Sequence, residues 1–117
     1  MAIFVQTSNP KNLVDKIYKA ISQGDIDTWV ADKFHHNYLT HITSDRQWYQ
    51  KAWIGYQIEL DQVVFCMIGR PGFPISIPEY AIYHGRFTEM LLAHFDQDFD
   101  YIHTSALLDP DYDQNLG

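Results

Sequence analysis

The strongest constraint on the fold comes from two neighbouring segments in the middle of the chain. Apolar and polar side chains alternate over residues 54–60, as in a strand with one buried face. Asp61 and Gln62 can turn the chain into residues 63–68, which are apolar at every position. A strand that is apolar on both faces is typical of the centre of a sheet whose two faces are covered. This part of the chain therefore predicts a hairpin whose second strand is central.

Two amphipathic segments with capping signals predict long helices. Asn9 can cap a helix over residues 10–23 that begins with a proline and ends at Gly24. A capping box that begins at Ser76 opens a second helix, over residues 77–95. The apolar stripe of this second helix should lie on the sheet, and it consists of Tyr80, Tyr83, Phe87, Leu91 and His94, with Met90 and Phe95 beside it.

Shorter patterns complete the predicted architecture. We expect a short helix, capped by Ser44, over residues 45–51. Alternating strand patterns occupy residues 2–7, 26–31, 38–42 and 101–106. The order β-α-β-β-(short α)-β-β-α-β predicts a single α+β domain with a mixed, mainly antiparallel sheet of about five or six strands and two long helices. The domain is expected to span residues 1–108 and to be followed by an acidic tail, residues 109–117.

The net charge of the chain is concentrated near its C-terminal end. The formal net charge is −7, and residues 96–117 carry six aspartates and no Lys or Arg. Such a surface attracts basic partners and repels nucleic acid phosphates. Because no complete catalytic set is present, we expect a non-catalytic protein-interaction module, an inhibitor or immunity-like protein that covers a basic protein partner. The aspartates expected to contact that partner are Asp96, Asp98, Asp100, Asp109, Asp111 and Asp113.

Neither the aspartates nor the six histidines match a metal site in detail. Each aspartate triplet is similar to the start of a calcium loop, but the sixth position is Tyr101 or Gln114 instead of glycine. The position of the glutamate that closes such a loop is Leu107 in the first triplet. The histidines lack the spacing of known zinc sites. We therefore expect no metal ion and no cofactor.

A cluster of aromatic and charged residues around Gly85 supports a second interpretation, a small enzyme or small-molecule binder. His84 could act as a general base beside Tyr80, with Arg86 as an anion clamp. Alternatively, Arg86 pairs with Glu89 on an exposed helix face and His84 lies at the edge of the core. The pocket of this second interpretation would combine Trp29, Tyr80, His84, Arg86 and, on a lid-like loop, Arg70.

Other features narrow the class of protein. No glycine-rich nucleotide loop and no Gly-x-Ser-x-Gly elbow occurs, and Cys66 lies in an apolar run where a thiol packs as a small hydrophobe. We expect a cytoplasmic protein, because no stretch reaches the roughly 18 apolar residues of a membrane span and the first residues lack the features of a signal peptide. Aromatic residues make up 15% of the chain, more than a sheet with helices on one side readily hides, which predicts a homodimer through a sheet edge or the open face.

Three segments of the chain are similar to small bacterial proteins of unassigned function, namely residues 9–13, 24–29 and 83–92. The resemblance extends over most of the chain. It implies a compact bacterial domain, and it brings no functional residue with it.

Overall fold

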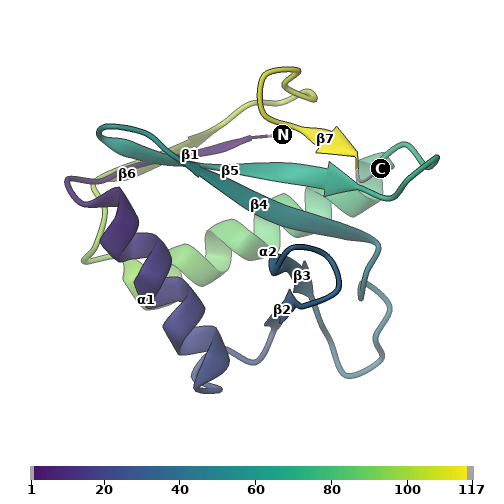
Figure 1. Ribbon diagram of the computed structural model, residues 1–117, viewed down its shortest axis with the longest axis horizontal. Coiled ribbons are helices and arrows are strands. Elements are labelled where there is room, and N and C mark those ends of the chain that lie inside the picture. Colours follow the sequence, from purple (N-terminus) through teal and green to yellow (C-terminus); the bar gives the residue numbers. More distant parts are fainter. Residues whose placement is uncertain (1, 116–117) are drawn as a thin grey trace.

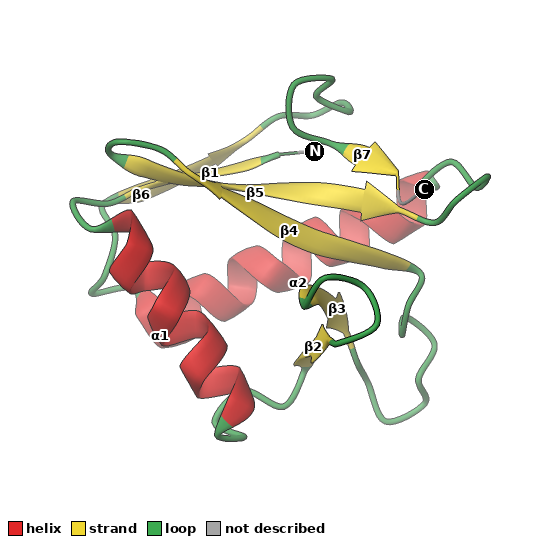
Figure 2. Cartoon of the chain, in the orientation of Figure 1, coloured by secondary structure: helices red, strands yellow, loops and turns green. Residues whose placement is uncertain are grey.

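Residues 2–115 are described by the computed structural model, which builds one sheet and two helices from them (Figures 1 and 2). The order of the antiparallel strands across the sheet is β2 (Trp29–Asp32), β3 (Tyr38–His41), β4 (Ala52–Ile58), β5 (Gln62–Gly69), β1 (Ile3–Gln6) and β6 (Tyr101–Thr104). A short strand, β7 (Gln114–Asn115), pairs in parallel with the end of β5. The helices are α1 (Pro10–Ser22) and α2 (Ile77–Phe95). The predicted single α+β domain is confirmed.

The two central strands form the predicted hairpin. Seven residue pairs join β4 to β5, starting with Ala52 opposite Gly69. Across the turn, the backbone N–H of Glu59 donates to the carbonyl oxygen of Gln62 at 2.9 Å. Every residue of β5 after the first is buried, as expected for a strand that is apolar on both faces.

One face of β5 packs against both helices. Val63, Phe65 and Met67 point to this side and belong to the main core. The helices lie together on this side of the sheet in Figures 1 and 2. The buried residues that α2 adds to the core are Tyr83, Phe87, Met90, Leu91 and Phe95. His94, which the predicted stripe included, is exposed.

Side chains from β3 and from the C-terminal segment cover part of the opposite face. A second buried cluster lies there, formed by Trp53, Cys66 and Ile68 with the partly buried rings of Tyr38 and Tyr112. A β-carbon at Gly55 would lie 2.8 Å from Ile68 Cδ1 and 3.1 Å from the Tyr38 ring, so these two side chains pack directly on the backbone of β4. This close approach requires a residue without a side chain.

The predicted short helix over residues 45–51 is wrong. Arg46 and Gln50 have positive φ angles of 57° and 59°, in the left-handed region that interrupts a right-handed helix. The segment forms a series of turns, and the carboxylate of Asp45 accepts hydrogen bonds from the Thr43 hydroxyl and the Gln47 backbone N–H. Local side-chain bonds of this kind compete with helix formation.

The strand predicted over residues 26–31 begins at Trp29, because the chain before it wraps around the end of α1. The backbone N–H groups of Asp25 and Ile26 both donate to the carbonyl oxygen of Ala20. Gly24 makes this wrap with a φ of 82°, a conformation that glycine adopts without strain. Residues 25–28 therefore run beside the helices before β2 starts.

The C-terminal segment packs against the end of β5. The buried carboxylate of Asp113 accepts the backbone N–H of Met67 at 2.6 Å and that of Asp109 at 2.8 Å. Met67 lies beyond the last β5 residue that pairs with β1, so Asp113 takes the place of a strand partner there. The described residues 109–115, which we expected as an acidic tail, contact the sheet through Asp113 and β7. The expected tail also includes residues 116–117, which lie outside the described residues.

Candidate functional site

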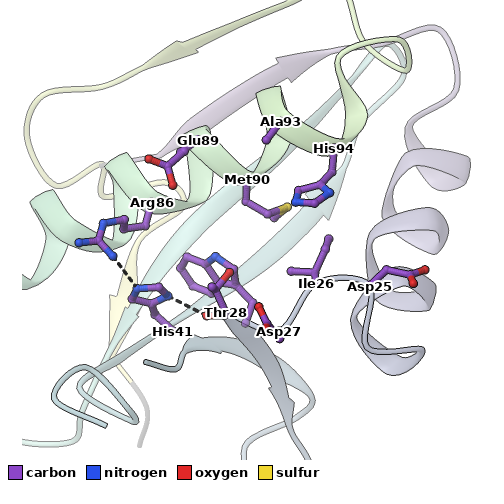
Figure 3. Close-up of a pocket in the computed structure, with 11 residues that line it drawn as sticks. Asp25, Ile26, Asp27, Thr28, His41, Arg86, Glu89, Met90, Ala93 and His94 are labelled. Atoms are coloured by element: carbon purple, nitrogen blue, oxygen red, sulfur yellow. Dashed lines mark hydrogen bonds between the residues drawn. The ribbon is translucent and has the colours of Figure 1, made fainter. Parts of the chain in front are cut away.

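A cleft of about 240 Å³ lies between α2 and the segment that leads into β2 (Figure 3). On α2 it is lined at i, i+3, i+4, i+7 and i+8 by Arg86, Glu89, Met90, Ala93 and His94. This spacing places all five on one side of the helix. The opposite wall consists of Asp25, Ile26, Asp27, Thr28, Trp29 and His41.

The floor of the cleft is apolar and buried. Trp29 is 2% exposed and Met90 is 4% exposed, and the Trp29 indole packs edge-on against the rings of Tyr83 and Phe87. The indole Nε1–H is buried and finds no acceptor among the described residues. An unpaired buried N–H costs about 1–3 kcal/mol, so the indole of Trp29 is a polar group that the described residues leave unsatisfied.

His41 lies beside Trp29 and is held in one protonation state. Its Nδ1 is 2.7 Å from the carbonyl oxygen of Thr28, which can only accept, so Nδ1 carries the proton and donates. Nε2 is then the acceptor, and it lies 3.4 Å from Nη1 of Arg86. Burial lowers the pKa of His41 below its usual value, and the nearby guanidinium of Arg86 lowers it further. The ring is therefore neutral at pH 7.

The charges of the cleft are unevenly distributed. Figure 3 shows Arg86 and His41 at one end and Asp25 at the other. Glu89 and Asp27 also line the cleft. Three carboxylates and one guanidinium give the cleft a formal charge of −2. A cationic group and an anionic group can thus be bound at different points of one cleft.

The residues of the predicted pocket do not all meet. Trp29 and Arg86 line the cleft, whereas Tyr80 and His84 do not. His84 and Arg86 are two positions apart on α2, which directs them about 200° apart around the helix axis. Arg70 pairs with Glu79 at 3.1 Å, near the start of α2.

The His84 imidazole is partly buried against the core side of α2. Its Nε2 is buried and has no hydrogen-bond partner among residues 2–115. Burial lowers the pKa of His84 to about 4, so the ring is neutral at pH 7 and a weak proton acceptor. No ion pair joins Arg86 to Glu89 among the described residues, and Arg86 contacts His41 instead.

The two aspartate triplets lie at opposite ends of β5. Asp98 pairs with Lys16 at 2.7 Å, and the Asp100 backbone N–H donates to the carbonyl oxygen of Gln6, whose partner is the first residue of β5. Asp113 binds the backbone of Met67, five residues further along β5, or about 17 Å away. The triplets therefore form two separate groups. Among their members, Asp96, Asp100 and Asp111 are exposed.

Sequence reasoning missed most of the cleft. His41 is one of the six histidines that match no metal site in the sequence, and the pairing of β2 with β3 places it directly opposite Trp29. Asp25 precedes the strand expected over residues 26–31, and Asp27 lies within that expected strand, whereas in the structure both aspartates precede β2. One sequence pattern could have indicated the α2 wall of the cleft. Arg86, Glu89 and Ala93 follow one another at i, i+3 and i+7, beside the apolar stripe of α2.

Comparisons with protein-family models, with curated proteins and with solved structures find no match to this chain. In the described part of the chain, no three His, Cys, Asp or Glu side chains are grouped so that they could hold a metal ion. Neither helix among residues 2–115 has the length and apolar character needed to cross a membrane.

Proposed function

We propose that this protein binds a small polar molecule in the cleft between α2 and the segment before β2. The observation that carries the proposal is the composition of the cleft, a buried floor with an unpaired indole N–H below a rim of charged side chains. Concave sites with an apolar floor and a few convergent polar groups are the usual form of ligand pockets. The occupant would supply the acceptor that Trp29 lacks.

Binding without covalent chemistry is favoured by the groups around His41. Its Nδ1–H is engaged by Thr28, and its Nε2 faces the guanidinium of Arg86, which makes this nitrogen a weak proton acceptor. The described residues that line the cleft offer Thr28 and three carboxylates but no serine, cysteine or lysine, and no base is placed to activate the Thr28 hydroxyl. The arrangement is suited to orienting a ligand through fixed donors and acceptors.

The first test is a ligand screen read out at Trp29. The three tryptophans give three indole N–H signals in a ¹⁵N–¹H spectrum, and Trp29→Phe assigns the one from the floor. A library of small polar metabolites should contain a compound that shifts this signal. Arg86→Gln should weaken its binding about tenfold, because Arg86 provides the charged donor of the rim.

Arg46→Gln is the matched control. The Arg46 guanidinium lies over the Tyr49 ring, outside the cleft, so its removal should leave the dissociation constant unchanged. The proposal is wrong if no compound moves the Trp29 signal. It is equally wrong if both arginine variants weaken binding to the same extent.

Exposed aspartates favour a second function, the coverage of a basic protein partner. Asp96 and Asp100 lie near one end of β5 and Asp111 near the other, and all three side chains face solvent.

A cytoplasmic location and a homodimer through a sheet edge or the open face also stay predictions. For the dimer, β2 and β6 are the outer strands of the sheet, and light scattering should give twice the chain mass of 13.7 kDa.

A further inference from the structure

The geometry points to a basic amino acid, of the lysine or arginine type, as the molecule that the cleft binds. The inference rests on the proposed function and specifies its ligand. It follows from three properties of the cleft, namely the separation of its charges, its length and its net charge.

The separation of charges requires a ligand with both signs. Arg86 can receive a carboxylate in two parallel hydrogen bonds, the geometry that guanidinium groups favour. Glu89 lies one turn further along α2 on the same wall, within reach of an α-ammonium group beside that carboxylate. An α-amino acid presents these two groups on one carbon atom.

The length of the cleft exceeds what the α-carbon groups alone would fill. Its wall on α2 extends from Arg86 to His94, which is about 12 Å along the helix axis. A volume of 240 Å³ corresponds to roughly eight water molecules of about 30 Å³ each. A molecule of about ten non-hydrogen atoms, such as lysine, matches this space and is smaller than the ligands of most pockets.

The net charge selects the side chain of the ligand. A simple zwitterion leaves the formal charge of −2 unbalanced, whereas a second cationic group reduces it. In Figure 3, Asp25 lies beyond the apolar residues Ile26 and Met90 from Arg86, and Asp27 lies beside Thr28, before Ile26 is reached. The methylene groups of a lysine side chain would lie over the apolar floor, and its terminal ammonium would reach the two aspartates.

Calorimetric titration with lysine and four relatives tests each group of the ligand separately. Norleucine keeps the chain length and lacks the terminal cation, and Nα-acetyl-lysine lacks the α-ammonium. Lysinamide carries an amide in place of the carboxylate, and cadaverine carries a hydrogen atom there. Lysine should bind at least about tenfold more tightly than each of them, since every one leaves a charged group of the cleft unpaired.

Two variants assign the ends of the ligand. Asp27→Asn should weaken lysine binding about tenfold and leave norleucine binding unchanged, because only lysine carries the cation that contacts Asp27. Arg86→Gln should weaken both of these ligands and leave cadaverine binding unchanged. Asp61→Asn is the control for the aspartate change, since Asp61 lies exposed in the turn before β5.

Norleucine binding as tightly as lysine would overturn the inference, and so would an Asp27→Asn variant that weakens both ligands equally. If the basic amino acids fail to bind while another compound shifts the Trp29 signal in an Arg86-dependent way, the proposed function stands and the ligand class is wrong. If neither they nor any compound of the library moves that signal, both proposals fail.

Discussion

At the scale of single residues, the carboxylate of Asp32 joins three parts of the fold. Asp32 is buried at the end of β2, and its carboxylate accepts hydrogen bonds from the Phe34 backbone N–H, His35 Nδ1, Gln50 Nε2 and Trp53 Nε1. Burial raises the pKa of Asp32, but these hydrogen bonds outweigh burial and hold the pKa below its usual value. A single carboxylate thus ties the β2–β3 turn to the irregular segment before β4 and to β4 itself.

Replacement of Asp32 by alanine should be strongly destabilising. The change leaves the buried indole N–H of Trp53 and the Gln50 amide without their acceptor, and we expect the free energy of unfolding to fall by about 3 kcal/mol. Asp45→Ala is the comparison, because Asp45 also accepts two hydrogen bonds but lies on the surface. Urea unfolding of both variants gives the measurement. Equal losses would mean that burial of the carboxylate is not what makes Asp32 important.

His84 should make stability depend on pH. In the unfolded chain a histidine has a pKa near 6.5, whereas in the folded protein burial lowers the pKa of His84 to about 4. Between these values the unfolded state takes up a proton that the folded state does not, so the free energy of unfolding falls as the pH decreases from 6.5 to 4. Below about pH 4 both states are protonated and this contribution stays constant.

The variant His84→Gln should reduce that pH dependence. Urea unfolding at pH 7.5, 5.5 and 4.5 measures the slope, part of which remains because burial also lowers the pKa of His41. His94→Gln serves as control, since His94 is exposed at the other end of α2. A His84→Gln variant with the slope of the unchanged protein would show that His84 is not the residue responsible.

At the scale of elements, segments with one dominant local signal were predictable. The capping box at Ser76 and the stripe behind it give α2 its observed bounds, because the hydrogen bonds that cap a helix are made within four residues. The hairpin of β4 and β5 follows from side-chain alternation in the same way. The segment after Ser44 carries a similar capping pattern and forms turns, because the local bonds to Asp45 and a contact with β3 both compete with a helix. The Thr40 hydroxyl accepts the backbone N–H of Gln50.

The cleft shows why a site is harder to predict than the elements around it. Its α2 wall could be identified from helical spacing, which is a local property. Its other wall depends on how residues 25–28 wrap around the end of α1 and on the pairing that sets His41 opposite Trp29. Both depend on contacts between residues far apart in sequence, and periodicity does not record these. The pocket predicted from the sequence therefore included Arg86 and Trp29, which line the cleft, together with His84, which lies on another side of α2.

At the scale of the whole molecule, acidic side chains have two different roles. Asp113 is buried and completes the hydrogen bonding of β5, whereas Asp96, Asp100 and Asp111 are exposed. The formal charge of −7 therefore includes a carboxylate that the fold requires as well as carboxylates that are available to a basic partner. Changes that neutralise all aspartates of a triplet at once would confuse the two roles.

Separate variants should distinguish them. Asp113→Asn exchanges an acceptor oxygen for an amide group, so the free energy of unfolding should fall by about 2 kcal/mol. The combined change of Asp96, Asp100 and Asp111 to asparagine should alter it by less than about 1 kcal/mol, because exposed charges contribute little to stability. If the acidic surface contacts a basic protein, this triple variant, which stays folded, should also lose that protein in a pull-down from the native host. If the triple variant and the unchanged chain recover the same basic proteins, the exposed aspartates do not contribute to partner binding.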